Sequence, residues 1–320
     1  MPRLTSLLPR VFSAALIALP VTLAAQAGMV VEQHTTFNIA KLSTADLQQT
    51  MSILGTDRAK TVTTGKTKVL IISADASGTE ITRFDQDQVI RLNDKKKTYT
   101  VESLAEMRAA LAKQQQDVAK SAAESREKDD VRIYAVLDEA RRTGQKQVIN
   151  GFSTEQALIK ITVMAENTKT KEKAVTFHIT ADMWFDPSQA EAARVSHAFY
   201  AARVKALGID PGMATNPYAK WLDNVHVEMA KISGYPIRTT ITFEGVVDTA
   251  AAKAKKDNAP PPTSIGGALG GMFAKKKSEP APASPNGGPV LFTSMTEVLS
   301  ISTKAPAASE FEIPAGYVKK

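Results

Sequence analysis

Cysteine is absent from this chain of 320 residues, and histidine occurs only four times. Without cysteine there is no disulfide framework, no thiol nucleophile and no thiolate ligand for a structural zinc ion. The four histidines have no H-E-x-x-H or other metal-ligand spacing. We therefore expect no cofactor and no metal, and a hydrophobic core large enough to hold the fold without covalent cross-links.

Long apolar runs are also lacking beyond the first 27 residues, which have the three parts of a secretory signal peptide. Arg3 and Arg10 form the basic start, Val11 to Leu23 is the apolar part, and cleavage is expected after Ala27. The alternative is an uncleaved anchor, but this run is shorter than the roughly 20 residues that span a bilayer. The mature chain is predicted to be exported, periplasmic or secreted, with no transmembrane segment after cleavage.

The formal charge of +7 does not indicate nucleic-acid binding, because of where the charge lies. Removing Arg3 and Arg10 with the signal leaves +5. Six lysines against Asp257 and Glu279 place +4 of this in the stretch from Thr249 to Pro289. A nucleic-acid-binding domain carries its positive charge on a folded face with interleaved aromatic residues. No nucleic-acid partner is expected.

That stretch, 249–289, differs in composition from the rest of the chain. It contains an Ala/Lys run, three consecutive prolines and a glycine-rich patch, a composition too poor in apolar residues to form a core. We predict a disordered insertion within a single domain formed by residues 28–248 and 290–320. Its apolar Ile265 to Phe273, beside Lys275 to Lys277, could contact anionic lipid or a partner protein, although a flexible linker has the same composition.

Short apolar runs separated by turn residues dominate the folded part and predict an antiparallel sheet. A meander is expected from Lys66 to Val101, with four short strands. Its expected strands are Val69–Ile72, Thr79–Phe84, Val89–Leu92 and Thr98–Val101. Further expected strands are Met29–Ile39, Ala157–Met164, Val175–Phe185, Ile237–Val247 and Val290–Ile301. Val131 to Val148 is expected to form a hairpin, with a helix as the alternative, and Lys41 to Gly55 is ambiguous and could open a short helix.

Three longer segments have helical signals. Ser103 and Glu106 form a capping box before a helix that reaches Lys128, and its polar second half predicts a solvent-exposed extension. Asp186-Pro187 begins a second helix that ends at Gly208. Asn216-Pro217 begins a third in the same way. Together these elements predict an α+β fold, a large curved antiparallel β-sheet or half-barrel with about three helices packed on one side.

Fragments of three functional motifs fail on spacing or have simpler explanations. Thr64 to Thr67 resembles the end of a phosphate-binding loop, but Lys60 stands where that loop needs glycine, so a polar turn is expected. Asp85 to Gln88 lacks the glycine and closing glutamate of a calcium loop and favours a hairpin turn. His178 and Asp182 share a strand face and could form an acid–base pair, but a solvated polar sheet face explains them at least as well.

Five short segments carry a resemblance to a known family. They are Pro306 with Phe311-Glu312-Ile313-Pro314-Ala315-Gly316-Tyr317, the pair Asp85…Ile90-Arg91-Leu92 and Lys97-Thr98-Tyr99, Gly151-Phe152, Met183-Trp184-Phe185, and Gly234-Tyr235-Pro236. The chain resembles an uncharacterised family of exported bacterial domains, similar in outline to outer-membrane lipoprotein carriers of the LolA type. The resemblance implies a half-barrel with helices on its concave side and an apolar cavity suited to acyl chains.

These observations predict a non-enzymatic protein of the cell envelope that binds an apolar ligand, a lipid or a lipidated envelope protein. The candidate cavity residues are apolar residues of two strands and of the third helix: Phe177, Ile179, Met183, Phe185, Ile241, Phe243, Leu222, Val225 and Met229. A closed core is the simpler interpretation of each residue taken singly. Two alternatives remain: a structural or interaction protein that uses residues 249–289 as a contact arm, and a hydrolase built on His178 and Asp182.

Overall fold

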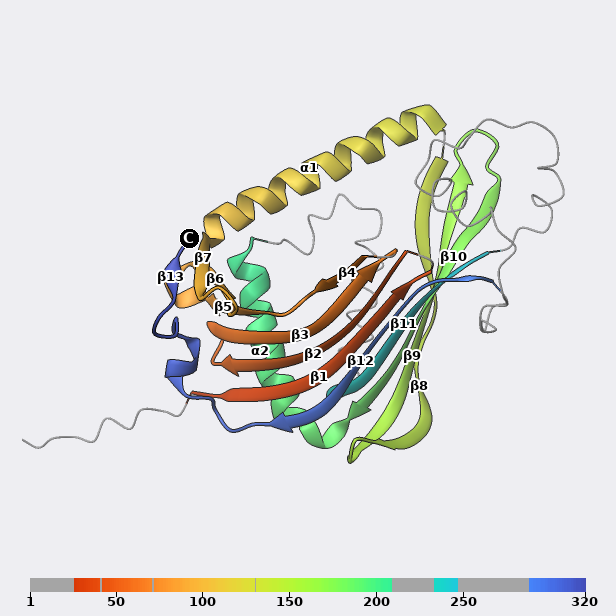
Figure 1. The fold of residues 1–320 in the computed structure, drawn as a ribbon. Helices are drawn as coiled ribbons and strands as arrows, with labels where there is room; N and C mark the ends of the chain where they lie inside the picture. The colour runs from red at the N-terminus through yellow and green to blue at the C-terminus, as the bar shows by residue number, and fades with distance from the viewer. Residues whose placement is uncertain (1–25, 41, 71, 130, 209–232, 247–287) are drawn as a thin grey trace, which may run out of the picture.

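The computed structural model describes residues 26–40, 42–70, 72–129, 131–208, 233–246 and 288–320. Within these ranges the chain is mostly β, and its strands join into one open, twisted sheet of 13 strands (Figure 1). The predicted large antiparallel sheet is confirmed. Two α-helices accompany the sheet in this part of the chain, where about three were expected. The third expected helix falls almost wholly in residues 209–232, outside the described ranges.

The sheet runs in the order β13-β7-β6-β5-β3-β2-β1-β12-β11-β10-β9-β8, and β4 pairs with β3 beside this path. All pairs are antiparallel except β13 with β7. The strands are β1 (Gly28–Ile39), β2 (Ser43–Leu54), β3 (Arg58–Val69), β4 (Ile72–Asp75), β5 (Gly78–Arg83), β6 (Gln88–Asn93), β7 (Thr98–Ser103), β8 (Val131–Ile149), β9 (Phe152–Asn167), β10 (Lys173–Asp186), β11 (Tyr235–Gly245), β12 (Val290–Ser302) and β13 (Val318–Lys319).

The middle of the sheet joins the two ends of the sequence. β1 pairs with β2 on one side and with β12 on the other, and β12 in turn pairs with β11. The strands before and after residues 247–287 are therefore hydrogen-bonded neighbours, and the chain on both sides of that stretch belongs to one sheet. The predicted disordered insertion lies outside the described residues, except for Gly288 and Pro289 at its end.

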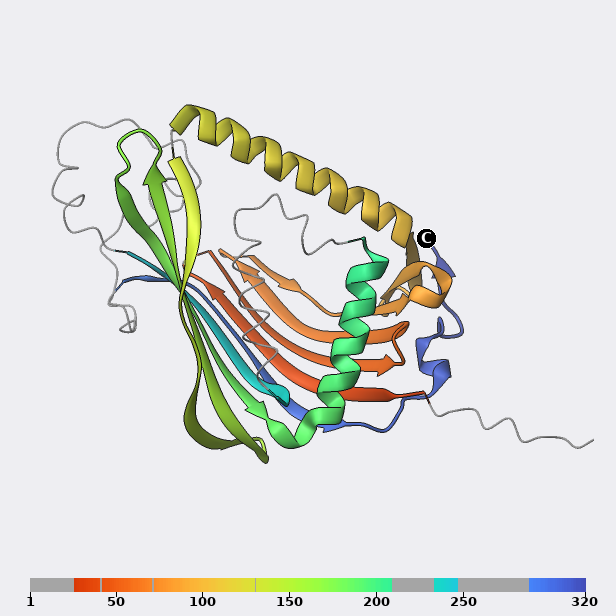
Figure 2. The ribbon, with the colours of Figure 1, turned by 180° about the vertical axis from the view of Figure 1, so that it is seen from behind.

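The first helix, α1 (Leu104–Asp129), begins at the expected capping box. The Ser103 amide donates to the Glu106 carboxylate at 2.8 Å, and the Glu106 amide donates to the Ser103 hydroxyl at 3.2 Å. Its first turns pack Leu104, Met107 and Leu111 against Leu207. Beyond that contact α1 runs clear of the sheet, as expected for its polar second half (Figures 1 and 2). Neither described helix combines the length and apolar character needed to cross a membrane.

The second helix, α2 (Ala190–Ala206), covers part of one face of the sheet, as Figure 2 shows. The predicted helix start at Asp186 is the cap of a short 3₁₀ helix, η2 (Pro187–Gln189), which leads directly into α2: the Asp186 carboxylate accepts a hydrogen bond from the Ser188 amide at 2.8 Å. The helix ends before Gly208, whose φ of 63° suits glycine. Val195 and Phe199 of α2 form a buried cluster with residues of β1, β2, β11 and β12. That cluster is the largest part of the core.

One segment was ambiguous from the sequence, and another differs from its predicted conformation. The segment Lys41 to Gly55 contains β2 instead of a short helix, because β1 and β3 pair with both of its edges and long-range pairing outweighs the local capping signals. Val131 to Val148 is neither a hairpin nor a helix but the single strand β8, with register shifts after Leu137 and Arg142. The turn between β8 and β9 lies at Asn150 and Gly151, which both have positive φ.

Two further predictions concern β3. The fragment Thr64 to Thr67 lies inside this strand and is not a turn. The apolar run from Val69 to Ile72 forms no strand of its own, since Val69 ends β3, Ile72 starts β4 and Leu70 has a left-handed φ of 54°. The remaining meander strands, β5, β6 and β7, lie where they were predicted.

Tyr235 gives the contact between β11 and α2 a dependence on pH. Burial raises the pKa of its hydroxyl to about 12, a nearby Tyr200 adds to this, and a hydrogen bond with Ser196 opposes it. Free tyrosine has a pKa near 10, so the unfolded chain releases this proton at lower pH than the folded protein does. The stability that the buried neutral hydroxyl contributes is therefore complete below about pH 10 and is lost as pH rises towards 12. Urea unfolding at pH 8 and pH 11 should show wild type losing about 1–2 kcal/mol more than Tyr235→Phe. Equal losses in the two proteins would contradict this prediction.

Candidate functional site

Strand β10 carries the cleanest alternation of apolar and polar residues in the chain, and it positions most of the predicted binding residues. Alternate side chains of a strand point to the same face of the sheet. Phe177, Ile179, Ala181 and Met183 therefore share one face. Opposite them on β9 lie Val163, Ile161, Ile159 and Ala157, which together with the β10 residues form a hydrophobic cluster.

The strand register extends this face across the middle of the sheet. Ile179 pairs with Ile161 on one side and with Phe243 on the other. Phe243 pairs with Phe292, which pairs with Ile39. We call these five residues, Ile161, Ile179, Phe243, Phe292 and Ile39, the apolar row. It places five large apolar side chains side by side on β9, β10, β11, β12 and β1.

Aromatic contacts hold the centre of the apolar row together. The rings of Phe177 and Phe243 stack at a centroid distance of 5.9 Å, and Phe243 meets Phe292 edge to face at 5.4 Å. Both geometries are favourable for aromatic pairs. The next row contains Ala181, Ile241 and Phe37, with Ser294 of β12 between Ile241 and Phe37. The apolar row is thus unbroken across five strands, and the row beside it is apolar except at Ser294.

This surface lies on the same side of the sheet as α2 but beyond the part that α2 buries. Met29 and Val31, which are fully buried in the α2 cluster, are on the same side of β1 as Phe37 and Ile39, because all four occupy alternate positions. Met29 and Val31 are completely inaccessible, whereas Phe37 and Ile39 remain partly exposed. Phe177, Ile179, Ile241, Phe243 and Phe292 are partly exposed as well.

The predicted binding residues divide into three groups. Phe177, Ile179, Ile241 and Phe243 lie together on the apolar surface and are partly exposed. Met183 and Phe185 lie at its inner end and are buried, with 5% and 4% exposure, so they belong to the core. Leu222, Val225 and Met229 fall in residues 209–232, outside the described ranges.

Sequence reasoning missed several members of the surface, among them Ile161 on β9 and Ile39, Phe37 and Phe292 on β1 and β12. The alternation along β1 and β12 was visible and predicted both strands. Nothing in the sequence showed that the two strands are neighbours of each other and that β12 also pairs with β11. Only the long-range register brings these residues beside Phe243.

A shallow hollow of about 390 Å³ lies over the ends of β1, β2, β3 and β4 and shares Phe37 with the edge of the apolar surface. Its lining is mostly polar and consists of Thr36, Phe37, Thr44, Ala45, Asp46, Lys66, Thr67, Lys68 and Ser73. Of the predicted cavity residues that the structure describes, none lines this hollow. The apolar surface is partly exposed along most of its length and is buried at Ile161, which is 4% exposed.

The opposite face of β10 is polar and holds His178 and Asp182. His178 Nδ1 lies 2.9 Å from the Thr162 hydroxyl, which donates to the Asp138 carboxylate at 2.6 Å. Asp182 accepts a hydrogen bond from the Gln156 amide at 2.8 Å. The two groups proposed as an acid–base pair thus have different hydrogen-bond partners, and this arrangement matches the solvated polar face that was the alternative.

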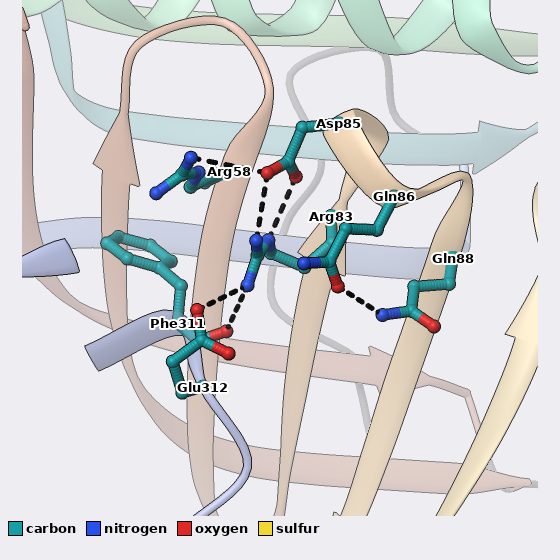
Figure 3. Close-up of polar contacts among 7 residues, drawn as sticks. All are labelled: Arg58, Arg83, Asp85, Gln86, Gln88, Phe311 and Glu312. Atoms are coloured by element: carbon teal, nitrogen blue, oxygen red, sulfur yellow. Dashed lines mark hydrogen bonds and ion pairs between the residues drawn. The ribbon is translucent and has the colours of Figure 1, made fainter. Parts of the chain in front are cut away.

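A buried ionic cluster lies at the other end of the sheet, around Arg83 (Figure 3). Arg83 binds the Asp85 carboxylate through two hydrogen bonds of 2.8 Å, from Nε and Nη2. Its Nη1 donates to the Phe311 carbonyl at 3.2 Å and to the Glu312 carboxylate at 2.7 Å. Arg58 adds a second cation 3.2 Å from Asp85. The hydrogen bonds from Arg83 hold the pKa of Asp85 below its usual range.

The arrangement around Arg83 is structural. Phe311, in the short helix η3 (Ala308–Phe311), is fully buried against Leu54, Ile81, Ile90 and Leu92, and Arg83 binds the backbone beside it. The guanidinium therefore fastens the C-terminal segment, part of the F-E-I-P-A-G-Y sequence, to the first strands of the sheet. The fragment that resembled a calcium loop is a short turn, η1 (Phe84–Gln86), and Asp85 is bound by arginine.

In the described part of the chain, no three His, Asp or Glu side chains converge in a way that could hold a metal ion. Comparison with protein-family models, with curated proteins and with solved structures finds no match for this chain. The resemblance to exported carrier domains remains a prediction from short motifs. The function has to be argued from the apolar surface itself.

Proposed function

We propose that this chain is a non-enzymatic protein of the cell envelope that binds an apolar ligand, or the acyl chain of a lipidated partner, on the surface around the apolar row. In this proposal the protein is exported by its N-terminal signal, and the sheet forms the wall of a half-barrel that holds the ligand. The observation that carries the proposal is the partial exposure of Phe177, Ile179, Phe243 and Phe292 on one continuous face.

The size and chemistry of this surface support the proposal. A soluble domain rarely leaves a contiguous apolar surface open unless it binds something there. Ligand sites for apolar molecules are lined mainly by hydrophobic and aromatic side chains, with few polar groups. The apolar row has that composition, and its stacked phenylalanines offer a flat surface on which an acyl chain can lie. Burial of each CH₂ group contributes about 0.8 kcal/mol to binding.

Phe243→Asp should test the surface, because it places a charge at the centre of the row. We expect binding of a fluorescent fatty-acid probe to weaken by about tenfold or more, since a carboxylate in an apolar contact is strongly unfavourable. Thr242→Asp is the matched control: it adds the same charge to the adjacent residue, which points to the polar face of β11. That variant should bind within about twofold of wild type.

Thermal unfolding of each variant separates loss of binding from loss of the fold. Native mass spectrometry of protein purified from the envelope should in addition show a bound lipid mass. If wild type carries no lipid and binds no probe, or if Phe243→Asp binds as tightly as wild type while remaining folded, the proposed function is wrong.

A further inference from the structure

The turn between β3 and β4 exposes an unusual amount of apolar surface. Val69, Leu70 and Ile72 are 54%, 61% and 70% exposed, respectively. They come at the end of a hairpin whose two strands pair only from Lys66 to Val69 and from Ile72 to Asp75. We call Val69, Leu70 and Ile72 the apolar tip. It lies at the opposite end of β3 from Arg58 and the ionic cluster around Arg83.

The backbone of the tip makes its composition more unusual. Leu70 has a φ of 54°, in the left-handed region that favours glycine, asparagine and aspartate. The other non-glycine residues with positive φ in the described chain are polar: Asp87, Lys97, Asn150 and Lys171. Leucine at this position combines an unfavourable conformation with an exposed apolar side chain. The backbone conformation contributes to the fold, because the Leu70 amide donates to the Leu42 carbonyl at 2.7 Å. The apolar side chain is 61% exposed and is therefore available for a contact outside the molecule.

The charged residue nearest the tip in the register is Lys68, whose cross-strand neighbours are Thr44 and Ser73. Lys66 and Lys68 are exposed on β3, immediately before Val69. Lys66, further from the tip, lies opposite Asp46 and Asp75, which also contact His34 at 2.7 Å and Lys95, respectively. The positive charge closest to the apolar side chains is therefore that of Lys68. The tip therefore presents apolar side chains with lysines behind them. That order of groups matches the interface of an anionic bilayer, where lysine reaches the phosphates while apolar side chains enter the acyl region.

We propose that the apolar tip docks on the surface of a membrane containing anionic lipid. A protruding turn fits this occupant better than a protein groove, because a bilayer needs no matching shape and rewards apolar burial and positive charge. Docking at the tip is independent of the apolar row: a chain that binds vesicles through Leu70 need not hold a ligand on its sheet, and the reverse also applies. The two proposals can therefore fail separately.

Flotation with lipid vesicles tests the proposal. Wild type should float with vesicles of phosphatidylglycerol and phosphatidylcholine, and much less with phosphatidylcholine alone. The double variant Leu70→Asn/Ile72→Ser should bind anionic vesicles at least about tenfold more weakly. Asparagine suits the left-handed φ, so the variant should be folded and no less stable. Val148→Ser, at a residue 68% exposed on β8, is the matched control and should bind like wild type.

The absence of cysteine allows a second measurement. Leu70→Cys and Val148→Cys can each be labelled at a single site with an environment-sensitive fluorophore. Emission from position 70 should shift to the blue with anionic vesicles, and emission from position 148 should not. The proposal is overturned if wild type does not float, or if the double variant binds as wild type does. It is also overturned if Leu70→Asn/Ile72→Ser abolishes only a self-association seen in sedimentation, which would identify a second copy as the occupant.

Discussion

Replacing Arg83 by methionine is expected to lower the free energy of unfolding by about 3 kcal/mol. Only 5% of the Arg83 side chain is exposed, and it satisfies Asp85, the Phe311 carbonyl and Glu312 at once. Methionine has a similar length but no donors, so Asp85 keeps only Arg58 as a partner and the Phe311 carbonyl loses the hydrogen bond from Arg83. The effect should fall at the lower end of the range for broken buried ion pairs, because Arg58 remains beside Asp85.

A matched control distinguishes burial from mere ion pairing. Arg91 also contacts two carboxylates, those of Glu80 and Glu102, but 49% of its side chain is exposed. Arg91→Met should therefore change stability by at most about 1 kcal/mol. Urea unfolding measures both variants, and limited proteolysis should show earlier cleavage near Phe311 in Arg83→Met alone. Equal destabilisation by the two substitutions would show that Arg83 has no special role in fastening the C-terminal segment.

The parts of the fold that sequence analysis predicted correctly depend on residues close together in the chain. The Ser103–Glu106 capping box and the Asp186 cap each involve groups within three residues of each other. The alternation from Val175 to Phe185 likewise reports the burial of a single strand. Such signals survive in the folded protein because no distant contact opposes them.

The elements that were ambiguous or predicted wrongly are decided by distant partners. Residues 43–54 contain a good helix start, but hydrogen bonding to β1 and β3 along both edges favours a strand. The turn residues Thr143 and Gly144 predicted a hairpin, but β9 continues to pair with β8 on both sides of them, and the irregularity is absorbed as a register shift. Thr143 and Gly144 therefore coincide with an irregularity of the strand, but this irregularity is a bulge within β8 and not the predicted hairpin turn.

The candidate site was predictable to a similar extent. Alternation identified Phe177 and Ile179, and separately Ile241 and Phe243, as residues that share a face on their own strands. The pairing of β10 with β11 then places the two pairs together. Ile39 and Phe292 could not be added from sequence, since they come from opposite ends of the folded chain and meet only through the β1–β12 register.

Gly65 is the second position where a single substitution should have a large effect. At this residue β3 changes partner, because residues Arg58–Thr63 pair with β5 and residues Lys66–Val69 pair with β4. Its φ is 145°, and a Cβ atom there would lie 2.1 Å from the Asp46 carbonyl oxygen on β2. A side chain would therefore strain the backbone and push β2 and β3 apart at the same time.

Gly65→Ala should accordingly lower the free energy of unfolding by about 2–4 kcal/mol, the combined size of one strained φ and one overpacked contact. Gly78→Ala on β5 is the matched control, since its φ is not in the left-handed region and nothing lies within 4 Å of the added methyl group. That substitution should change stability by no more than about 0.5 kcal/mol. Urea unfolding compares them directly. Similar stability in the two alanine variants would show that β2 and β3 can separate at Gly65 without loss. Gly65 also lies immediately before Lys66 and the paired part of the β3–β4 hairpin. Gly65→Ala should therefore displace the apolar tip and weaken vesicle flotation as well.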